Sequence, residues 1–356
     1  MAEKGRITLK DIAELAGVSI GTVYRVLHNN GRFSDETKGK VLRIIEEHGY
    51  KSSLHASANS MRRRLKFVIV LPDCSDGDYW SCIKDGIVRA VADYGNIPLD
   101  VDYVFYDRQD RDACSRTYEK IPEMNPDAVI IGSIFSENTI ELCKCLEHAD
   151  LPYFFVDTAV EGTKPVAVYS VDQRTAGMLM GRLADIMSSE TSDIMILDAD
   201  RYIMNKSDNY ILRKQGFDEF IAKESPEREV WEAVLYTDTS MNDKIESLLQ
   251  SENIGCVVVM NSRGYIIADL ICNLGVNNVK VIGFDLTKEN AERLRAGSIT
   301  ALIDQKPFIQ GYRVMKAAIT HVVYNSKSES RNVYLHADVL MKESLIHYDL
   351  QDVREL

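Results

Sequence analysis

After Lys66 the chain alternates short apolar runs with amphipathic stretches, and this alternation constrains the fold more than any other feature. Runs such as 67–71 (FVIVL) and 256–260 (CVVVM) have strand length and are apolar on both faces. Helical segments such as 80–95 and 174–189 lie between them. Such units form parallel sheets with right-handed crossovers. With 356 residues and 45% apolar composition, the chain is long enough for one or two α/β lobes and a small head.

The head is expected to contain a helical hairpin at residues 8–27, TLKDIAELAGVSIGTVYRVL, which include two short amphipathic stretches separated by Gly17. Thr8 and Ser19 are suited to cap the two helices, and Gly17 permits a tight turn between them. Each helix has one apolar face, made in the first by Ile12, Leu15 and Ala16 and in the second by Val23, Val26 and Leu27. Four positions of the second helix point away from that core: Ile20, Gly21, Tyr24 and Arg25. The pattern predicts an all-α helix-turn-helix DNA reader.

Charge is divided unevenly along the chain. Residues 1–66 carry 13 Lys and Arg against 7 Asp and Glu, whereas the whole chain has a net charge of −12. A basic head releases counterions beside phosphates, while an acidic body is repelled by them. A third helix is expected to begin at Ser34 and to end before Gly49. We therefore expect a DNA-binding head at 1–50, a linker at 51–66 and a body at 67–356.

Several classes of protein lack support in the sequence. The N-terminus has no apolar segment of signal-peptide length and no run is long enough for a membrane span, so we expect a cytoplasmic protein with no membrane partner. No GxGxxG, GxxxxGK[ST] or GxSxG motif is present, which disfavours an α/β enzyme. The seven cysteines lack paired CxxC spacing, and the helical setting of Cys143 and Cys145 separates those two thiols. We expect no catalytic residues, no metal and no cofactor.

Polar side chains follow several of the apolar runs. In parallel sheets ligands gather at the carboxyl ends of strands. The residues found there are Asp73, Tyr79, Trp80, Ser133, Asp157, Asn261, Arg263, Asp285 and Gln305. Carboxylates and amides bond adjacent hydroxyl groups and aromatic faces cover C–H surfaces, so the set suits a polyhydroxylated ring. Any single member can equally be a turn residue, and core packing is the alternative role of Trp80.

The head resembles the signature of the Lac repressor (LacI/GalR) family, and the strand ends resemble that family's effector domain, which is similar to periplasmic sugar-binding proteins. The best anchors in the body are NYILRKQGF, VVVMNSRGY, VKVIGFDLT and ALIDQKPF. By this resemblance Arg213 is an effector contact as well; a surface salt bridge is its alternative role. The resemblance implies an α/β bilobed body, with lobe 1 at about 67–165 and 307–334, lobe 2 at about 166–305 and 335–356, and crossings near Val166, Lys306 and Leu335.

For the head, the resemblance implies a set of DNA-contacting residues: Thr8, Ser19, Ile20, Gly21, Thr22, Tyr24, Arg25, His28, Arg32, Ser34 and Asn59. Arg25 suits guanine, and Ser19, Thr22 and Ser34 suit phosphates. The family usually has Ser at Tyr24 and Asn at His28, so the operator is expected to differ from the family's usual one. Asn59 stands where the family carries a leucine wedge and Ser52 and Ser53 replace Pro and Asn, which leaves open whether the linker kinks DNA.

The resemblance therefore implies a transcription regulator, in most cases a repressor, whose affinity for operator DNA is controlled by a small sugar-like effector between two lobes. The absence of a leucine-heptad tail favours a homodimer over a tetramer. A sugar sensor without DNA binding or a solute-binding protein is the alternative, and an α/β enzyme is a weaker one. The identity of the effector and the direction of its effect are open.

Overall fold

The computed structural model describes residues 9–27, 33–47, 63–198, 207–235, 242–251, 253–276, 278–324 and 331–346. The chain divides into two compact units, Met1–Arg62 and Arg63–Leu356, which we call the head and the body. None of the helices in the described parts has both the length and the apolar composition needed to span a bilayer.

The head contains three helices, α1 (Leu9–Ala16), α2 (Ile20–Leu27) and α3 (Asp35–Glu47). Gly17 makes the turn between the first two with a φ of 67°, as expected. Ser19 caps α2 by accepting from the backbone N–H of Thr22 at 3.1 Å, and Ser34 caps α3 by accepting from that of Thr37 at 3.2 Å. Both caps confirm the predicted helix starts.

The buried core of the head differs from the predicted one in α1. Its fully buried apolar side chains are Ile12, Ala13, Ala16, Val23, Val26 and Val41. Leu15 was expected on the same face but is 52% exposed, so that prediction is wrong. Ile12 and Ala16 lie one turn apart, and Ala13 rather than Leu15 completes the stripe that α2 and α3 cover.

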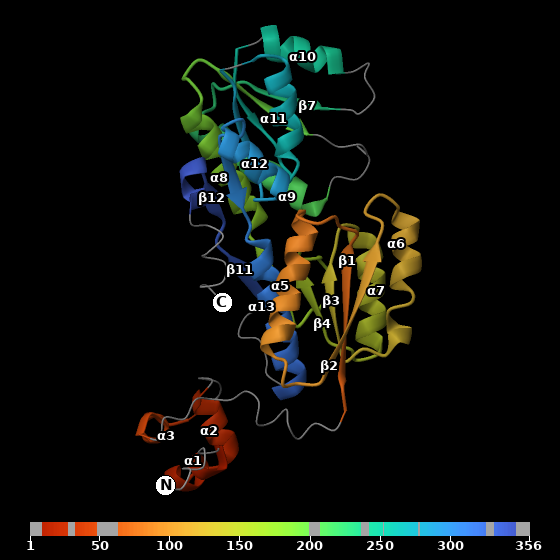
Figure 1. The fold of residues 1–356 in the computed structure, drawn as a ribbon, viewed down its shortest axis with the longest axis vertical. Coiled ribbons are helices and arrows are strands. Elements are labelled where there is room, and N and C mark those ends of the chain that lie inside the picture. Colours follow the sequence, from red (N-terminus) through yellow and green to blue (C-terminus); the bar gives the residue numbers. More distant parts are fainter. Residues whose placement is uncertain are drawn as a thin grey trace. The chain divides into compact units, whose positions relative to one another are not determined.

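Lobe 1 of the body is built on a six-stranded parallel sheet in the order β11-β5-β4-β3-β1-β2. Its strands are β1 (Leu65–Pro72), β2 (Leu99–Tyr106), β3 (Ala128–Gly132), β4 (Tyr153–Val156), β5 (Ala167–Val171) and β11 (Asn332–Leu335). Its helices are α5 (Tyr79–Asp93), α6 (Arg111–Tyr118), α7 (Ser136–His148) and α13 (Pro307–Tyr324), with a 3-10 turn, η1 (Pro122–Met124). Helices α5 and α13 lie side by side along the sheet (Figure 1).

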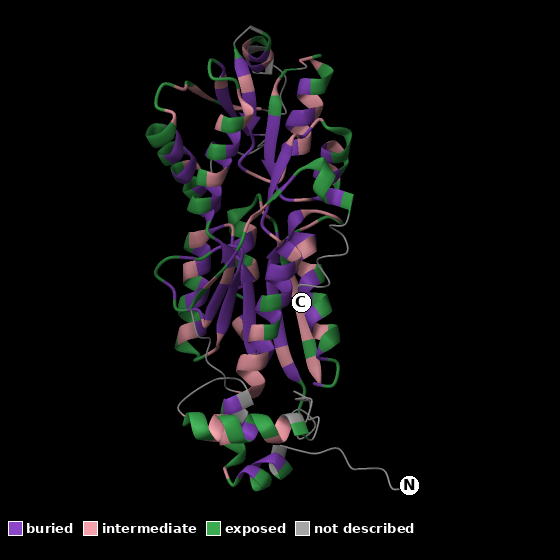
Figure 2. Cartoon of the chain, turned by 90° about the vertical axis from the view of Figure 1, so that its left-hand side faces the viewer, coloured by how far each residue is buried: buried purple, intermediate pink, exposed green. Residues whose placement is uncertain are grey.

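Lobe 2 repeats this plan with the order β12-β10-β9-β8-β6-β7, where β12 alone pairs antiparallel. Its strands are β6 (Asp193–Asp198), β7 (Val230–Val234), β8 (Ile254–Val258), β9 (Lys280–Phe284), β10 (Ala301–Asp304) and β12 (Asp338–Leu340). Its helices are α8 (Gln173–Met187), α9 (Asp208–Glu224), α10 (Asn242–Ser251), α11 (Gly264–Asn273), α12 (Lys288–Ala296) and the 3-10 helix η3 (Lys342–Ile346). In both lobes the central strands are buried, the edge strands β2, β7 and β11 are mostly half-buried or exposed, and the helices expose their outer faces (Figure 2).

The predicted boundaries between the lobes need correction. Strand β5 pairs with β4 and β11 in the sheet of lobe 1, so the first crossing follows Val171 rather than lying near Val166. Leu335 likewise belongs to β11 in lobe 1. The expected linker overlaps β1, which begins at Leu65. An apolar run has the same periodicity whichever sheet it joins, so the pattern could not place β5.

Two glycines bring α8 and α9 into close contact in lobe 2. A Cβ atom on Gly177 would lie 1.9 Å from the carbonyl oxygen of Arg213, and one on Gly216 would lie 1.9 Å from that of Arg174. Such distances exclude any side chain at either position without movement of a helix. The contact therefore fixes where α9 presents Arg213.

Candidate functional site

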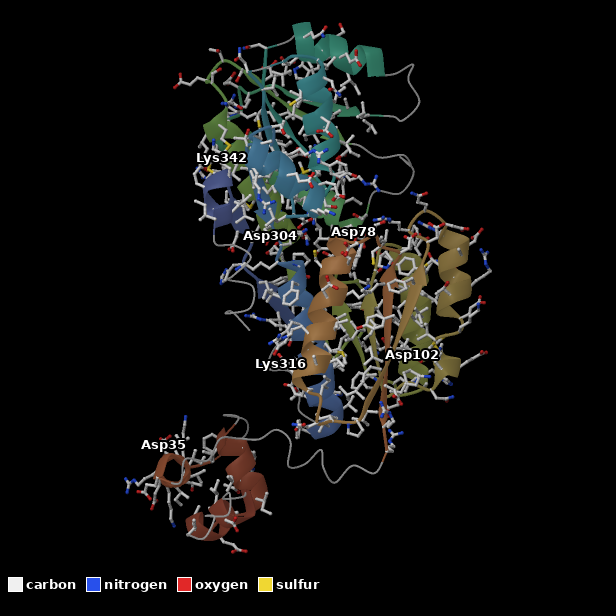
Figure 3. All side chains as sticks on the ribbon, viewed as in Figure 1. Asp35, Asp78, Asp102, Asp304, Lys316 and Lys342 are labelled. Carbon is white, nitrogen blue, oxygen red and sulfur yellow. The ribbon has the colours of Figure 1, made fainter. Side chains whose placement is uncertain are left out.

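The body contains a cavity of about 260 Å³ where the carboxyl ends of both sheets meet. Figure 3 places Asp78, before α5, and Asp304, at the end of β10, at this junction of the lobes, whereas Asp102 and Lys316 lie farther down lobe 1. The volume is just below the range of drug-sized pockets, about 300–1,000 Å³, so the cavity suits a small ligand.

The structure brings together nearly all of the residues expected to bind an effector. Those that line the cavity are Tyr79, Trp80, Ser133, Asp157, Arg213, Asn261, Arg263, Asp285 and Gln305. Asp73 does not line it. Its side chain is 56% exposed and its carboxylate lies 3.6 Å from Nε of Arg108, because the strand end turns it outward.

Other cavity residues were missed by the sequence analysis, among them Asp78, Arg108, Gln109, Asn209 and Tyr210. Arg108 and Gln109 follow β2, so the rule that selected the other strand ends also applied to them. Asn209 and Tyr210 precede Arg213 by four and three residues on α9 and share its face. The helical spacing was therefore the signal that could have found them.

Arg213 is the centre of the lobe 2 wall and is only 6% exposed, so the alternative of a surface salt bridge is wrong. Its Nε donates to Gln173 Oε1 at 2.7 Å, Nη1 to the Met260 carbonyl at 2.7 Å and Nη2 to Gln305 Oε1 at 2.8 Å. The guanidinium carbon lies 4.1 Å from the centroid of the Phe284 ring. These contacts hold the guanidinium plane in one orientation beside the cavity.

Asp285 is linked to Arg213 through the side chain of Gln305, which bonds both residues, and is 2% exposed. The Gln305 amide donates to both of its carboxylate oxygens, at 2.8 and 3.0 Å. Burial, partly offset by the charge of Arg213, raises the pKa of Asp285 to about 8. Its φ of 65° places a non-glycine residue in the left-handed region, a strain that is common at ligand sites.

Asp157 forms the corresponding part of the lobe 1 wall, and its φ of 73° is also left-handed. Its carboxylate accepts from the Tyr79 hydroxyl at 2.6 Å and from Thr158 Oγ1 at 3.0 Å. Asn209 of lobe 2 also donates to it, at 2.9 Å, so this carboxylate joins the two walls. Burial raises the pKa of Asp157 and raises that of Tyr79 well above its ordinary value.

Trp80 combines both of the roles considered for it. It lines the cavity and meets the Tyr79 ring in an edge-on contact with 5.5 Å between centroids. It is nevertheless 7% exposed and packs so closely on Gly132 that a Cβ there would lie 2.5 Å from the indole. Core packing thus fixes an aromatic side chain beside the ligand space.

No group of three or more His, Cys, Asp or Glu side chains that could hold a metal ion occurs in the described ranges. Cys143 is buried and Cys145 is exposed on α7, which confirms that these two thiols diverge.

In the head, α2 presents an exposed surface made by Ile20, Gly21 and Arg25. Arg25 Nε donates to the Gly21 carbonyl at 3.1 Å and Nη2 donates to Thr22 Oγ1 at 3.1 Å. Five predicted DNA contacts cannot be placed: Thr8, His28, Arg32 and Asn59 and the side chain of Tyr24 lie outside the described residues. The assignment of this set to DNA stays a prediction.

Comparisons with known proteins match both parts of the chain. Residues 8–53 match the family of bacterial regulatory proteins named lacI, and residues 67–326 match the periplasmic binding protein domain. The HTH-type transcriptional regulator DegA of Bacillus subtilis is 40% identical over 85 residues, which are 24% of this chain and 25% of DegA. The match thus spans about a quarter of that relative.

Solved structures resemble the body. A Bacteroides fragilis protein assigned as a LacI transcriptional regulator has a TM-score of 0.75 and 22% identity, over 80% of this chain and 100% of that one. GanP, a glucose-galactose binding protein from Geobacillus stearothermophilus, has a TM-score of 0.68 and 20% identity over the same shares, 80% and 100%. At these identities the likeness concerns the fold.

Proposed function

We propose that the chain is a DNA-binding transcription regulator controlled by a small effector, because it belongs to the periplasmic binding protein domain family and its residues 8–53 match the lacI family of bacterial regulatory proteins. The proposal rests above all on the cavity, whose two walls belong to different lobes and are bonded to each other through Asp157 and Asn209. A ligand held there contacts both lobes, so its binding free energy depends on how they are arranged.

The chemistry of the walls favours a polyhydroxylated effector of monosaccharide size. Carboxylate, amide and guanidinium groups surround one small space, and an aromatic residue flanks it. These groups bond vicinal hydroxyls, while the indole of Trp80 covers C–H surface. The structural neighbour GanP is a glucose-galactose binding protein, which supports this class of ligand.

On DNA, we propose that Arg25 reads a base from the exposed face of α2 and that Ser19, Thr22 and Ser34 contact phosphates. Two copies of the chain bind a near-palindromic operator as a homodimer, and the effector changes their affinity for it. The division of charge supports this arrangement, because the basic segment 1–66 suits the duplex and the acidic body does not.

The proposal is tested with the full-length protein. Duplexes that bind the protein are selected from a random pool. The affinity for the selected DNA is then measured from low to high salt, with and without a panel of monosaccharides and sugar acids. We expect a near-palindromic site, an affinity that falls steeply with salt, and at least one panel compound that changes it. Enrichment of no sequence, or a salt-independent affinity, refutes DNA regulation; unchanged affinity and melting temperature with every sugar refute the effector class.

A further inference from the structure

Gln310, on the first turn of α13, is fully buried and does not belong to the cavity lining. Its side chain nevertheless bonds groups on both sides of the cavity. Oε1 accepts from the Asp157 backbone N–H at 3.1 Å, and Nε2 donates to the Tyr79 hydroxyl oxygen at 3.3 Å and to the Gln305 carbonyl at 2.8 Å. A polar side chain buried this deeply, with each polar atom bonded, is held in one position.

The neighbouring groups fix the orientation of this amide. A backbone N–H can only donate and a carbonyl can only accept, so Oε1 must face Asp157 and Nε2 must face Gln305. The Tyr79 hydroxyl therefore accepts from Gln310, and its single proton is directed to Asp157, which it meets at 2.6 Å. Gln310 thus determines which way the hydrogen bonds run along the lobe 1 wall.

The same amide reaches the lobe 2 wall through the segment that crosses between the lobes. Gln305 directly follows β10, and its side chain bonds both Arg213 and Asp285. The next residue, Lys306, has a left-handed φ of 55° and pairs at 2.9 Å with Asp338, near the last crossing. Gln310 therefore connects Tyr79 and Asp157 in the lobe 1 wall to the backbone of Gln305, whose side-chain amide bonds the groups of the lobe 2 wall.

We propose that Gln310 is a positioning residue for the effector site: without touching the ligand, it orients Tyr79 and Asp157 and couples them to Gln305. This inference rests on the proposed function for the identity of the ligand. The orientation of Tyr79 and Asp157 by Gln310 does not depend on that function. Removal of the amide leaves the Tyr79 hydroxyl held by Asp157 alone, and leaves the Asp157 N–H and the Gln305 carbonyl with one partner fewer. Both walls then lose the alignment that a ligand needs to bond them together.

The variants Gln310→Met and Gln310→Glu separate positioning from packing. Methionine keeps the volume and removes all three bonds, whereas glutamate keeps the acceptor for Asp157 and loses both donors. Met315→Leu, a fully buried change farther along α13, serves as the control. Affinity is measured by calorimetry with D-galactose, D-ribose and D-glucuronate from pH 5 to 8.

We expect Gln310→Met to weaken the best-binding panel sugar at least tenfold at every pH, while Met315→Leu stays within twofold of the wild type. Gln310→Glu is expected to match the methionine variant at pH 8 and to recover at pH 5, because a protonated glutamic acid again donates one hydrogen bond. The affinity of each variant is divided by that of the wild type at the same pH, so that the titration of groups present in every protein cancels. The titratable or charged groups around the amide are Tyr79 on α5, Asp157 after β4, Asp304 on β10, and Asp285 and Arg213 beyond Gln305.

A ligand-free measurement keeps the test independent of the effector. In a Trp231→Phe background Trp80 is the sole tryptophan, and it contacts the Tyr79 ring. We expect acrylamide quenching of Trp80 to rise in Gln310→Met and not in Met315→Leu. If no panel sugar binds the wild type, the effector class fails and the quenching result alone decides the role of Gln310. Quenching equal to that of the control, or loss of affinity in Gln310→Glu that does not recover at pH 5 in a protein that binds a sugar, overturns the inference.

Discussion

Asn209 and Asp157 belong to different lobes, yet the amide nitrogen of one lies 2.9 Å from a carboxylate oxygen of the other. Both side chains are buried, at 7% and 5% exposure, so the bond is shielded from water. A hydrogen bond to a charged acceptor in such a setting contributes about 1.5–3 kcal/mol. The structure thus contains a contact that holds the two lobes in their present arrangement.

The first prediction follows from this bond. Asn209→Leu keeps the size of the side chain and removes the donor, so the lobes should open more often and the radius of gyration from X-ray scattering should rise. Effector affinity should fall by about tenfold or more. Ser188→Ala is the control, since it removes a partly buried bond to the Ala184 carbonyl that lies entirely within lobe 2. An unchanged radius and affinity in the Asn209 variant would show that the bond does not hold the lobes.

The second prediction concerns the pH dependence of stability. Burial raises the pKa of Asp285 to about 8, above its value in the unfolded chain. The folded state therefore keeps a proton that the unfolded state releases, and this contribution to the free energy of unfolding falls as pH rises from about 4 to about 8. Asp285→Asn removes the titration, so its Tm should decline less than that of the wild type between pH 5 and pH 8.

Asp73→Asn, which changes an exposed carboxylate, is the control for this measurement. Asp157 has a raised pKa with the same sign and is present in both proteins, so it reduces stability across its own window in each. Parallel Tm curves for wild type and Asp285→Asn would contradict the assignment.

The third prediction is that Arg213→Lys strongly impairs effector binding although it keeps the charge. An ammonium group cannot bond Gln173, Met260 and Gln305 at once in the geometry of the guanidinium, nor can it stack on Phe284 in the same way. We expect an affinity loss of about tenfold to a hundredfold by calorimetry. Arg174→Lys on α8, where the side chain is 56% exposed, should have no measurable effect. Equal affinities for both variants would place the binding centre elsewhere.

The sequence predicted the residues that line the cavity better than it predicted the boundaries of the lobes. Strand ends such as Asp157, Asp285 and Gln305 could be found because parallel strands bring their carboxyl ends to one edge, a rule that needs no knowledge of strand order. The sheet to which β5 belongs depends on pairing with β4, which local periodicity does not encode. Asp73 failed for a related reason: a residue after a strand can turn toward the ligand or away from it.

The hydrogen-bond network behind the cavity was not predictable in the same way. Gln173 and Gln310 are buried and bonded to groups that line the cavity, but Gln173 is 40 residues from Arg213 and Gln310 is 231 residues from Tyr79 along the chain. In the sequence they are polar residues near the starts of two helices, where exposed glutamines are common. Their hydrogen bonds can be recognised only in the folded structure, where the three segments that cross between the lobes lie together.

The fourth prediction concerns reading of DNA by α2. Arg25→Lys keeps a charge near the phosphates and loses the planar fork that bonds guanine at two atoms. We expect the affinity for the selected operator to fall by about 1–3 kcal/mol, with relaxed discrimination at one base pair per half-site and an unchanged salt dependence. The control is Arg43→Lys on α3, which should leave discrimination intact. Competition with operators substituted one base pair at a time measures both. Full discrimination in Arg25→Lys would exclude Arg25 as a base reader.

The fifth prediction compares one substitution in two helices. In Gly216→Ala the new Cβ meets the Arg174 carbonyl at 1.9 Å, so α9 must move away from α8 and carries Arg213 with it. Overpacking of this kind costs about 1–3 kcal/mol.

Gly39→Ala is the comparison. Gly39 lies inside α3 with no atom within 4 Å of a Cβ placed on it, and the higher helix propensity of alanine should stabilise the head by about 0.5–1 kcal/mol. Calorimetric scans should therefore show a lower Tm for the body in Gly216→Ala, together with weaker effector binding, and a higher Tm for the head in Gly39→Ala. A Gly216→Ala protein with normal stability and affinity would show that the α8–α9 contact does not set the position of Arg213.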